Sequence, residues 1–518
     1  MRPERLIHDS LLTSAAAHPS KLALVTETGR YTYGELLDAS RRLAHGLQIH
    51  GLERGERVAI QLENGWTSAV AIYGTLLAGG VIMLLHPQTP PEKLRFILQD
   101  SAASFWLTET RLSGWLEALP ERVNLKGVIL SSAAGPLRDR TFDFDAFLGA
   151  SLPSPAAVFT IPLDLAALIY TSGTTGVPKG VMMNHQSMVF SLGSVLEYLA
   201  LRQDDHILSP LAFAFSYGLY QLFMNVTVGA TLHTMQANYP AALADRLIGE
   251  HITVFPAVPT LFASLIALAQ KGLVLPSLRC VTNAAAALPV AFVPQLQMLF
   301  PNARIFNMYG QTECKRVSYL EPELLAKHPN SVGRAIPGTE LFLLSETGEP
   351  VPHGEPGILY VRGPHVMMGY WQQPELTART LRPGRYPGEQ ILCTGDYFHL
   401  DENGLFYFVS RSDDIIKTRG EKVSPNEIEE VLYTLPGVLE AAVIGVPHPL
   451  LGEAVSAYLV LTPDASLSEQ LVKRACMARL EAAKIPTEIH FIEALPKTAS
   501  GKVRRQSLRD AVLSQNPV

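Results

Sequence analysis

The segment at residues 168–181, LIYTSGTTGVPKGV, combines residue types that can bind a polyphosphate. An apolar stretch that predicts a buried strand ends in a run of hydroxyl side chains and glycines, and Pro178 and Lys179 follow. Glycines let the backbone approach a ligand and present successive N–H groups, while the lysine adds positive charge. Only two residues separate Gly173 from Gly176 and no Gly-Lys-Ser/Thr follows, so this is not a Walker A loop. The expected phosphate contacts are Thr171, Ser172, Gly173, Thr174, Thr175, Gly176 and Lys179.

Four further motifs follow along the chain: MYGQTE at 308–313, CTGD at 393–396, SRSDDIIKTRGEKVSPNEIE at 410–429 and PKTASGKVRR at 496–505. Together with TSGTTGVPKG at 171–180, they resemble in order and spacing the signatures of one superfamily. It is the superfamily of acyl-CoA synthetases, peptide-synthetase adenylation domains and luciferases. The resemblance covers essentially the whole chain.

The resemblance implies an ATP-dependent ligase for a small carboxylic acid. A carboxylate oxygen would attack the α-phosphorus of ATP and expel pyrophosphate, and a thiol would then convert the acyl-AMP into a thioester. The acceptor would be CoA or the phosphopantetheine thiol of an acyl or peptidyl carrier protein. Because both reactants are anionic, such a site needs Mg²⁺ and positive side chains to screen their charge.

The resemblance also implies catalytic roles for individual residues. Glu313 would hold Mg²⁺, and Thr312 would contact the α-phosphate. Lys502 would bridge the substrate carboxylate and the α-phosphate in the transition state. Lys417 matches a position that serves one of the two half-reactions in acyl-CoA synthetases.

For the nucleotide, the resemblance predicts an aromatic face for adenine at Tyr309 and ribose partners at Asp396 and Arg411. The segment NAAAALP at 283–289 departs from the family pattern, because relatives often carry a glycine-bearing loop there. Alanine adopts left-handed backbone angles only at a cost, so we expect this loop to differ in shape. The expected nucleotide contacts outside the glycine-rich segment are Ala285, Asn307, Met308, Tyr309, Gly310, Asp396, Phe408 and Arg411.

The segment FAFSYGLYQLF at 213–223 bears on the choice of acid. Relatives that activate amino acids place an Asp here to pair with the substrate ammonium, whereas Ser216 takes that position in this chain. Burying an ammonium without a counter-ion costs on the order of several kcal/mol. We therefore expect an aryl or modest acyl acid, and FSYGL is similar to a motif of some aryl-acid CoA ligases. The expected substrate pocket comprises Phe215, Ser216, Tyr217, Tyr220, Asn283, Ala284 and Arg316.

Several alternatives stay open at this point. Arg316 binds a hydroxyl or second carboxylate of the substrate, or else it is a surface residue. A stand-alone amino-acid adenylation enzyme that loads a peptidyl carrier protein would need another group to neutralise the ammonium. A non-catalytic protein that keeps the fold is disfavoured, because Glu313, Asp396, Arg411 and Lys502 are all intact.

The elements that must position these residues follow from the sequence pattern. Helical periodicity alternates with short β-branched runs, which predicts parallel sheets with helices on their faces. Gly/Pro turns separate short strands at about 340–412, as in a β-rich subdomain. We expect an α/β protein with a large N-terminal domain at 1–412 and a small, mobile α+β domain at 413–518. Asp413 matches the position about which the small domain of relatives rotates, and it is the predicted hinge.

Bulk properties exclude other classes of protein. The net charge is -6 and only 17% of residues are charged, which argues against nucleic-acid binding. The four cysteines lie far apart without metal-ligand spacing, as in a cytoplasmic protein with reduced thiols. The apolar stretch at 68–85 predicts a buried helix followed by a buried strand, not a membrane span.

Overall fold

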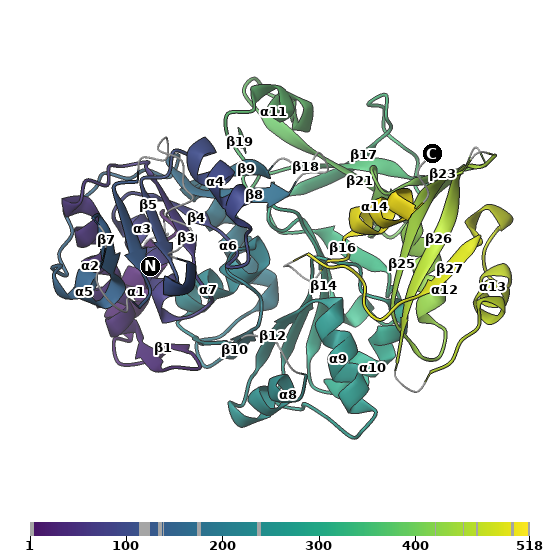
Figure 1. The fold of residues 1–518 in the computed structure, drawn as a ribbon, viewed down its shortest axis with the longest axis horizontal. Helices are drawn as coiled ribbons and strands as arrows, with labels where there is room; N and C mark the ends of the chain where they lie inside the picture. The colour runs from purple at the N-terminus through teal and green to yellow at the C-terminus, as the bar shows by residue number, and fades with distance from the viewer. Residues whose placement is uncertain are drawn as a thin grey trace.

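The computed structural model describes residues 5–112, 125–132, 137, 139–172, 178–235, 240–419, 421–448, 450–462, 465–498 and 502–515. Figure 1 shows a large N-terminal domain of helices and sheets beside a small C-terminal domain, which confirms the predicted fold class. Within these residues the strands form three sheets of 14, 8 and 5 strands.

The 14-stranded sheet runs through the middle of the large domain. Its central strands β10 to β14 pair in parallel, as the alternation of helices and strands predicts. The β-rich segment after residue 340 joins this sheet through the antiparallel pairing of β16 with β22. The strands, in spatial order, are β17 (Glu340–Leu344), β18 (Gly357–Arg362), β21 (Gln390–Leu400), β22 (Phe406–Arg411), β16 (Ser331–Ala335), β15 (Ser318–Leu320), β14 (Arg304–Tyr309), β13 (Cys280–Asn283), β12 (Val254–Ala257), β10 (His206–Ser209), β11 (Thr231–Thr234), β1 (Leu22–Val25) and β2 (Arg30–Thr32), with β20 (Leu381–Pro383) beside β21.

The 8-stranded sheet carries the strands on either side of the glycine-rich segment. β8 and β9 form an antiparallel pair in which Thr171 lies opposite Lys179. The remaining core strands are parallel and buried on both faces, which explains their continuous apolar sequence. The strands, in spatial order, are β19 (Gly369–Tyr370), β9 (Pro178–Asn184), β8 (Leu165–Ser172), β4 (Val81–Leu84), β3 (Arg57–Gln61), β5 (Phe105–Thr108), β6 (Gly127–Leu130) and β7 (Thr141–Asp143).

Helices cover both large sheets. Side chains of α2, α3, α6 and α7 share one buried core with residues of both sheets, so these helices pack between them. The core of α8, α9 and α10 lies against the 14-stranded sheet, and that of α4 lies against the 8-stranded sheet. The helices of the large domain are α1 (Asp9–Ala17), α2 (Tyr33–Ile49), α3 (Trp66–Leu77), α4 (Pro91–Asp100), α5 (Phe144–Gly149), α6 (His185–Leu199), α7 (Ser216–Val228), α8 (Pro240–Gly249), α9 (Pro259–Ala269), α10 (Val293–Leu299) and α11 (Pro374–Thr380).

The C-terminal domain has one sheet with a helical layer on each face. Along β25, Ala441 and Val443 pack with α12 and α13, whereas Ala442 and Ile444 pack with α14, as the period of two in a strand requires. Its strands are β24 (Glu421–Val423), β23 (Ile416–Thr418), β26 (Gly452–Leu461), β25 (Val438–His448) and β27 (Glu488–Phe491), and its helices are α12 (Pro425–Tyr433), α13 (Glu469–Met477) and α14 (Arg505–Gln515).

The chain passes from the large domain to the small one between Arg411, the last residue of β22, and Ile416, the first residue of β23. The predicted boundary at residues 412–413 lies in this turn. The stretch at 68–85 forms α3 and β4, both buried, as predicted. In the part of the chain that the structure describes, every helix is too short or too polar to cross a membrane.

Candidate active site

A cavity of about 400 Å³ lies where the two domains meet. The parallel strands β13 and β14 both end at the edge of this cavity. Their carboxyl ends lie together because neighbouring parallel strands run in the same direction. Ala284 and Ala285 follow β13, and Gly310 and Thr312 follow β14. A Cβ at Gly310 would lie 2.1 Å from the Lys315 carbonyl oxygen, so this tight turn requires glycine.

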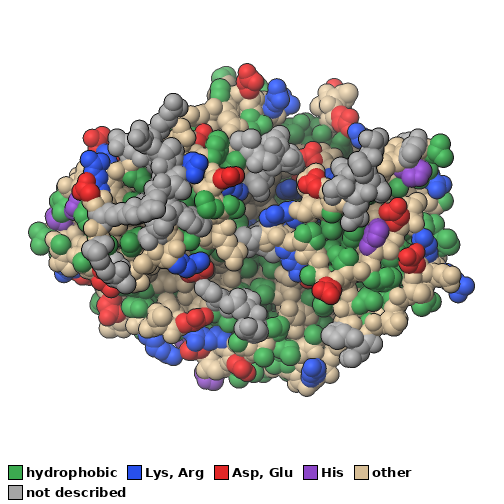
Figure 2. Space-filling view, in the orientation of Figure 1, with side chains coloured by type: hydrophobic (Ala, Val, Ile, Leu, Met, Phe, Trp, Pro, Cys, Tyr) green, Lys and Arg blue, Asp and Glu red, His purple; other side chains and the backbone are tan. Residues whose placement is uncertain are grey.

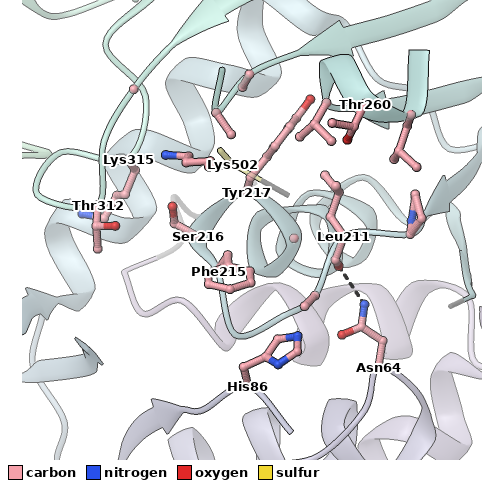
Figure 3. Close-up of a pocket in the computed structure, with 18 of the residues that line it drawn as sticks. Asn64, His86, Leu211, Phe215, Ser216, Tyr217, Thr260, Thr312, Lys315 and Lys502 are labelled. Atoms are coloured by element: carbon pink, nitrogen blue, oxygen red, sulfur yellow. Dashed lines mark hydrogen bonds between the residues drawn. The ribbon is translucent and has the colours of Figure 1, made fainter. Parts of the chain in front are cut away.

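The lining residues come from far apart in the sequence. Figure 3 shows Thr312 and Lys315 on one side of the cavity, Asn64 and Leu211 on the other, and Phe215 and Tyr217 between them. Figure 2 shows the face of the molecule drawn in Figure 1, which is hollowed near its centre, with Lys and Arg side chains at the edge of the hollow.

Tyr309, predicted to face adenine, forms one polar cluster with Asp396 and Arg411, which are predicted to bind the ribose. The pairing of β21 with β22 sets Asp396 opposite Arg411, whose Nε lies 3.7 Å from Asp396 Oδ1. The Tyr309 hydroxyl donates to Asp396 Oδ2 at 2.5 Å, and the Tyr309 ring stacks with Phe408. Burial raises the pKa of Asp396, against the opposing effect of Arg411. The carboxylate keeps lone pairs that can accept hydrogen bonds from a ribose.

Glu313 lies at the end of a chain of contacts from the glycine-rich segment. Its Oε1 accepts a hydrogen bond from the Tyr370 hydroxyl at 2.8 Å. The Lys179 Nζ lies 5.7 Å from the centre of the Tyr370 ring. No hydrogen bond of Oε2 is present among the described residues, which suits a cation that takes its other ligands from phosphates and water.

Lys502 reaches the cavity from the small domain. It precedes α14, and the segment before α14 extends toward the centre of the molecule in Figure 1. A small turn holds it, since the backbone N–H of Thr498 donates to the Lys502 carbonyl at 2.8 Å. Desolvation and Arg411 lower the pKa of Lys502 to about 8, while Asp396 and Glu313 oppose the shift. Lys502, Asp396, Arg411 and Glu313 therefore interact electrostatically across the domain boundary.

One side of the cavity, where the sequence predicts the substrate pocket, is built around the start of α7. Asn64 clamps the preceding loop, because its amide donates to the Leu211 carbonyl at 2.7 Å and accepts from the Phe213 N–H at 2.8 Å. This contact positions Phe215 and Ser216 at the cavity. The Tyr217 hydroxyl donates to the Thr282 carbonyl at 2.9 Å. Tyr217 therefore offers the cavity the face of its ring, while its hydroxyl is already hydrogen-bonded.

Two buried cations complete this wall. Arg316 is 4% exposed, and its guanidinium lies 4.5 Å from the centre of the Tyr217 ring. The interpretation of Arg316 as a surface residue is therefore wrong. Lys315 is 1% exposed and donates to Ser187 Oγ at 2.9 Å and to the His365 carbonyl at 3.2 Å. Burial lowers the pKa of Lys315 to about 7.

Several residues predicted for the site do not line this cavity. Tyr220 is buried within α7 and donates to the Met188 carbonyl at 3.2 Å, because the helix turns it away. The Asn283 amide donates to Asn307 Oδ1 at 2.9 Å, so this pair braces the ends of β13 and β14. Met308 lies behind the same wall, where its sulfur accepts from the Tyr198 hydroxyl at 3.1 Å. These placements correct the expectation of direct substrate contact for Tyr220 and Asn283.

Other predicted residues lie elsewhere. Lys417 is exposed on β23 of the small domain, outside the cavity. Asp413 lies in the exposed turn between the domains. Thr171 and Ser172 end β8 and Lys179 is the second residue of β9, so they flank the glycine-rich segment. Gly173, Thr174, Thr175 and Gly176 lie outside the described residues.

Some residues that line the cavity were not predicted from the sequence. Glu63 and Asn64 follow β3, and His86 and Gln88 follow β4. Polar residues directly after two buried apolar strands were a signal that could have found them. Lys315 gave no such signal, because its burial is visible only in the structure.

Comparison with known proteins agrees with this geometry. Residues 11–371 match the family described as AMP-binding enzyme, and residues 427–502 match its C-terminal domain. A long-chain-fatty-acid–CoA ligase of Bacillus subtilis (strain 168) is 30% identical over 544 residues, covering 98% of this chain and 94% of the relative. The structure of a benzoate CoA ligase from Burkholderia xenovorans LB400 is similar with a TM-score of 0.88 and 30% identity, covering 97% and 99% of the chains. The structure of the anthranilate CoA ligase AuaEII in complex with anthranoyl-AMP is similar with a TM-score of 0.89 and 26% identity. The match covers 99% of this chain and 98% of that one.

Proposed function

Since this chain belongs to the AMP-binding enzyme family, we propose that it joins a compact aryl or acyl acid to the thiol of CoA. It is an AMP-forming acid–thiol ligase that activates a carboxylic acid with ATP. The observation that carries the proposal is the convergence of Thr312, Lys502 and the α7 wall on one cavity beside the Tyr309–Asp396–Arg411 cluster.

In the first half-reaction, a carboxylate oxygen of the acid attacks the α-phosphorus of ATP. The bond from that phosphorus to the oxygen bridging to the β-phosphate breaks, and pyrophosphate leaves with the bonding electrons. Lys502 and Thr312 would stabilise charge on the α-phosphate oxygens and orient the carboxylate. Asp396 and Arg411 would hold the ribose.

In the second half-reaction, the sulfur of the acceptor thiol attacks the acyl carbon. The thiol gives up its proton to water and a carbon–sulfur bond forms. The bond between the acyl carbon and the phosphate oxygen of AMP breaks, and AMP leaves with the bonding electrons. CoA is favoured because the similar aryl-acid enzymes are CoA ligases. A carrier-protein phosphopantetheine presents the same thiol arm and is the alternative acceptor.

Mg²⁺ fits the residues at the phosphate side. No cluster of three acidic, His or Cys side chains that could hold a metal is found in the described part of the chain. Mg²⁺ with a nucleotide commonly uses one or two carboxylates and takes its other ligands from phosphates and water. Glu313 would supply that carboxylate, and the ion would neutralise phosphate charge during the first half-reaction.

The acid is proposed to lack an ammonium group. Among the described residues, the one carboxylate that lines the cavity is that of Glu63. Its Oε1 lies 3.6 Å from Arg111 Nη2. The side chains at the acid wall are Phe215, Tyr217 and two cations, which disfavour a further positive charge.

The test combines the protein with ATP, Mg²⁺ and a panel of aryl, aliphatic and amino acids, and measures pyrophosphate release. Thioester formation is then measured with CoA and with a phosphopantetheinylated carrier protein. We expect release with aryl or aliphatic acids, and release with amino acids alone would overturn the proposal. Lys502→Ala is expected to reduce release by about 10²- to 10³-fold, whereas Lys497→Ala, which removes an ion pair with Glu440, is the matched control.

A further inference from the structure

The guanidinium of Arg316 is buried at the cavity wall with most of its donors unused. Nη1 donates to the Lys315 carbonyl at 3.3 Å. Nε is buried and has no hydrogen-bond partner among the described residues. The described residues also provide no carboxylate in an ion pair with Arg316. A buried charge without a partner is costly, and native proteins keep one where a ligand supplies the partner.

Neighbouring groups do not supply the missing negative charge. Lys315 is itself a cation, and its Nζ is bonded to Ser187 and to the His365 carbonyl. Tyr217 contributes its ring face, and its hydroxyl is bonded to Thr282. Ring contact of this kind adds about 0.5–2 kcal/mol and orients the guanidinium plane. It leaves the N–H groups at the edge of that plane available.

Two other charged groups of the cavity have either a role in the proposed reaction or a partner of opposite charge. Lys502 would face the reacting carboxylate and the α-phosphate. Glu63 has Arg111 as its partner at 3.6 Å. In the described part of the cavity, Arg316 is thus a cation for which neither the protein nor the adenylation chemistry provides an anion.

We propose that the acid substrate carries a second carboxylate, remote from the one that reacts, and that Arg316 binds it. This inference rests on the proposed function and narrows its substrate class to dicarboxylic acids. A guanidinium offers parallel N–H groups that match the two oxygens of a carboxylate. A neutral acid would leave the guanidinium buried and unpaired, and a site of this kind discriminates strongly against ligands that lack the partner group.

The test compares matched acids for acid-dependent pyrophosphate release. One series pairs aliphatic monocarboxylic and dicarboxylic acids of equal chain length. The other uses benzoic acids whose ring carries a hydrogen, a hydroxyl or a second carboxylate. For the wild type we expect a kcat/KM at least about 10²-fold higher for the best diacid than for its monoacid partner.

Variants assign the preference to the guanidinium. Arg316→Met, of similar length, is expected to lose most of the diacid preference through a raised KM for diacids, while it still turns over monoacids. Arg316→Lys keeps the charge without the paired N–H groups and is expected to be intermediate. Arg304→Met is the matched control, because Arg304 also stacks on a ring, that of Phe306 at 5.0 Å, but is half exposed on β14 and outside the cavity.

Each outcome decides between the inference and its premise. Wild-type preference for monoacids or for the hydroxybenzoic acids would overturn the inference and leave the ligase function standing. The same holds if Arg316→Met keeps the diacid preference. Absence of pyrophosphate release with every acid would overturn the proposed function, and this inference with it.

Discussion

At the scale of single residues, burial and neighbouring charges set the protonation of the cavity. The pKa of Lys502 is lowered to about 8 and that of Lys315 to about 7, in both cases chiefly because the ammonium is desolvated. The pKa of Asp396 is raised for the same reason. The types of these residues are visible in the sequence, but the pKa of each group depends on the surroundings that the fold gives it.

The lowered pKa of Lys502 predicts a pH dependence of adenylation. The ammonium is charged below about pH 8 in the free enzyme and loses its charge as the pH rises through that value. Because kcat/KM reports groups of the free enzyme, kcat/KM for the acid is expected to fall about tenfold per unit above pH 8. Lys502→Arg stays charged and is expected to be slower but flat from about pH 7 to 9. A wild-type kcat/KM that rises through pH 9 would contradict this assignment. Lys497→Arg is the control and is expected to show the same fall of kcat/KM above pH 8 as the wild type.

Ala285 carries backbone strain in the loop beside the nucleotide site. Its φ is 75°, in the left-handed region, so this alanine adopts a backbone angle that is costly for a residue with a side chain. The expected difference in loop shape from relatives stays a prediction. This conformation costs an L-residue roughly 1–2 kcal/mol more than it costs glycine. Ala285→Gly is therefore expected to raise the free energy of unfolding by about 0.5–1 kcal/mol, after the greater entropy of the unfolded chain is subtracted. Denaturant unfolding measures this change in the free energy of unfolding. Ala286→Gly is the control and is expected to lower the free energy of unfolding, because Ala286 has no positive φ.

At the scale of elements, strand register and strand ends assemble the site. The antiparallel pairing of β21 and β22 sets Asp396 opposite Arg411. The parallel pairing of β13 and β14 brings the loops at 284–285 and 310–312 to one edge. The Asn283–Asn307 hydrogen bond fixes the last residues of these two strands. Residues that are not neighbours in the sequence thus meet because hydrogen-bonded strands must share a register.

The turn between β22 and β23 is the element about which the small domain is predicted to rotate. Asp413 is exposed there, and no hydrogen bond from its backbone N–H is present among the described residues. Proline restricts φ at its own position and the conformation of the residue before it. Asp413→Pro is expected to keep acid-dependent pyrophosphate release within about threefold and to reduce thioester formation by about 10²-fold. Asp413→Ala is the control, and equal loss of both half-reactions in the proline variant would contradict the hinge.

At the scale of the whole molecule, contacts between the domains place Lys502 in the cavity. Lys422 pairs with Glu346 at 2.6 Å, and the ring of Tyr433 meets Phe292 edge to face. The Asn330 amide donates to Glu430 Oε2 at 3.1 Å. The interface thus includes an ion pair, a hydrogen bond and an aromatic contact, which fits the mixed polar and apolar character of interfaces between domains of one chain.

Glu430 makes this contact sensitive to pH. Burial, together with Glu427 and Glu429, raises its pKa to about 7 from an ordinary value of 4.5. The stability that the protonated carboxyl provides is complete below pH 4.5 and is lost as the pH rises through about 7. Glu430→Gln, which mimics the protonated form, is expected to raise Tm at pH 8 and to leave it nearly unchanged at pH 4.5. The control is thermal unfolding of Glu469→Gln, which changes an exposed glutamate of α13. A higher Tm of Glu430→Gln at both pH values would show that the gain in stability does not come from the raised pKa of Glu430.

The sequence by itself determined the α/β class, the large and small domains and the chemistry of adenylation. Short motifs suffice for this because phosphate loops, strand-end carboxylates and a C-terminal lysine each need particular residue types at particular positions. Strand and helix periodicity likewise depends on local pattern, so α3, β4 and α12 could be predicted.

Only the tertiary structure decided which side chains line the acid cavity. Phe215 and Tyr217 face it while Tyr220 does not, since a shift of a few residues along α7 changes the face of the helix. Asn64 and His86 come from the loops after β3 and β4, two strands of another sheet that lie far away in the sequence. Whether Arg316 was buried or exposed also depended on long-range packing, because its surroundings come from α7 and the β14–β15 turn together.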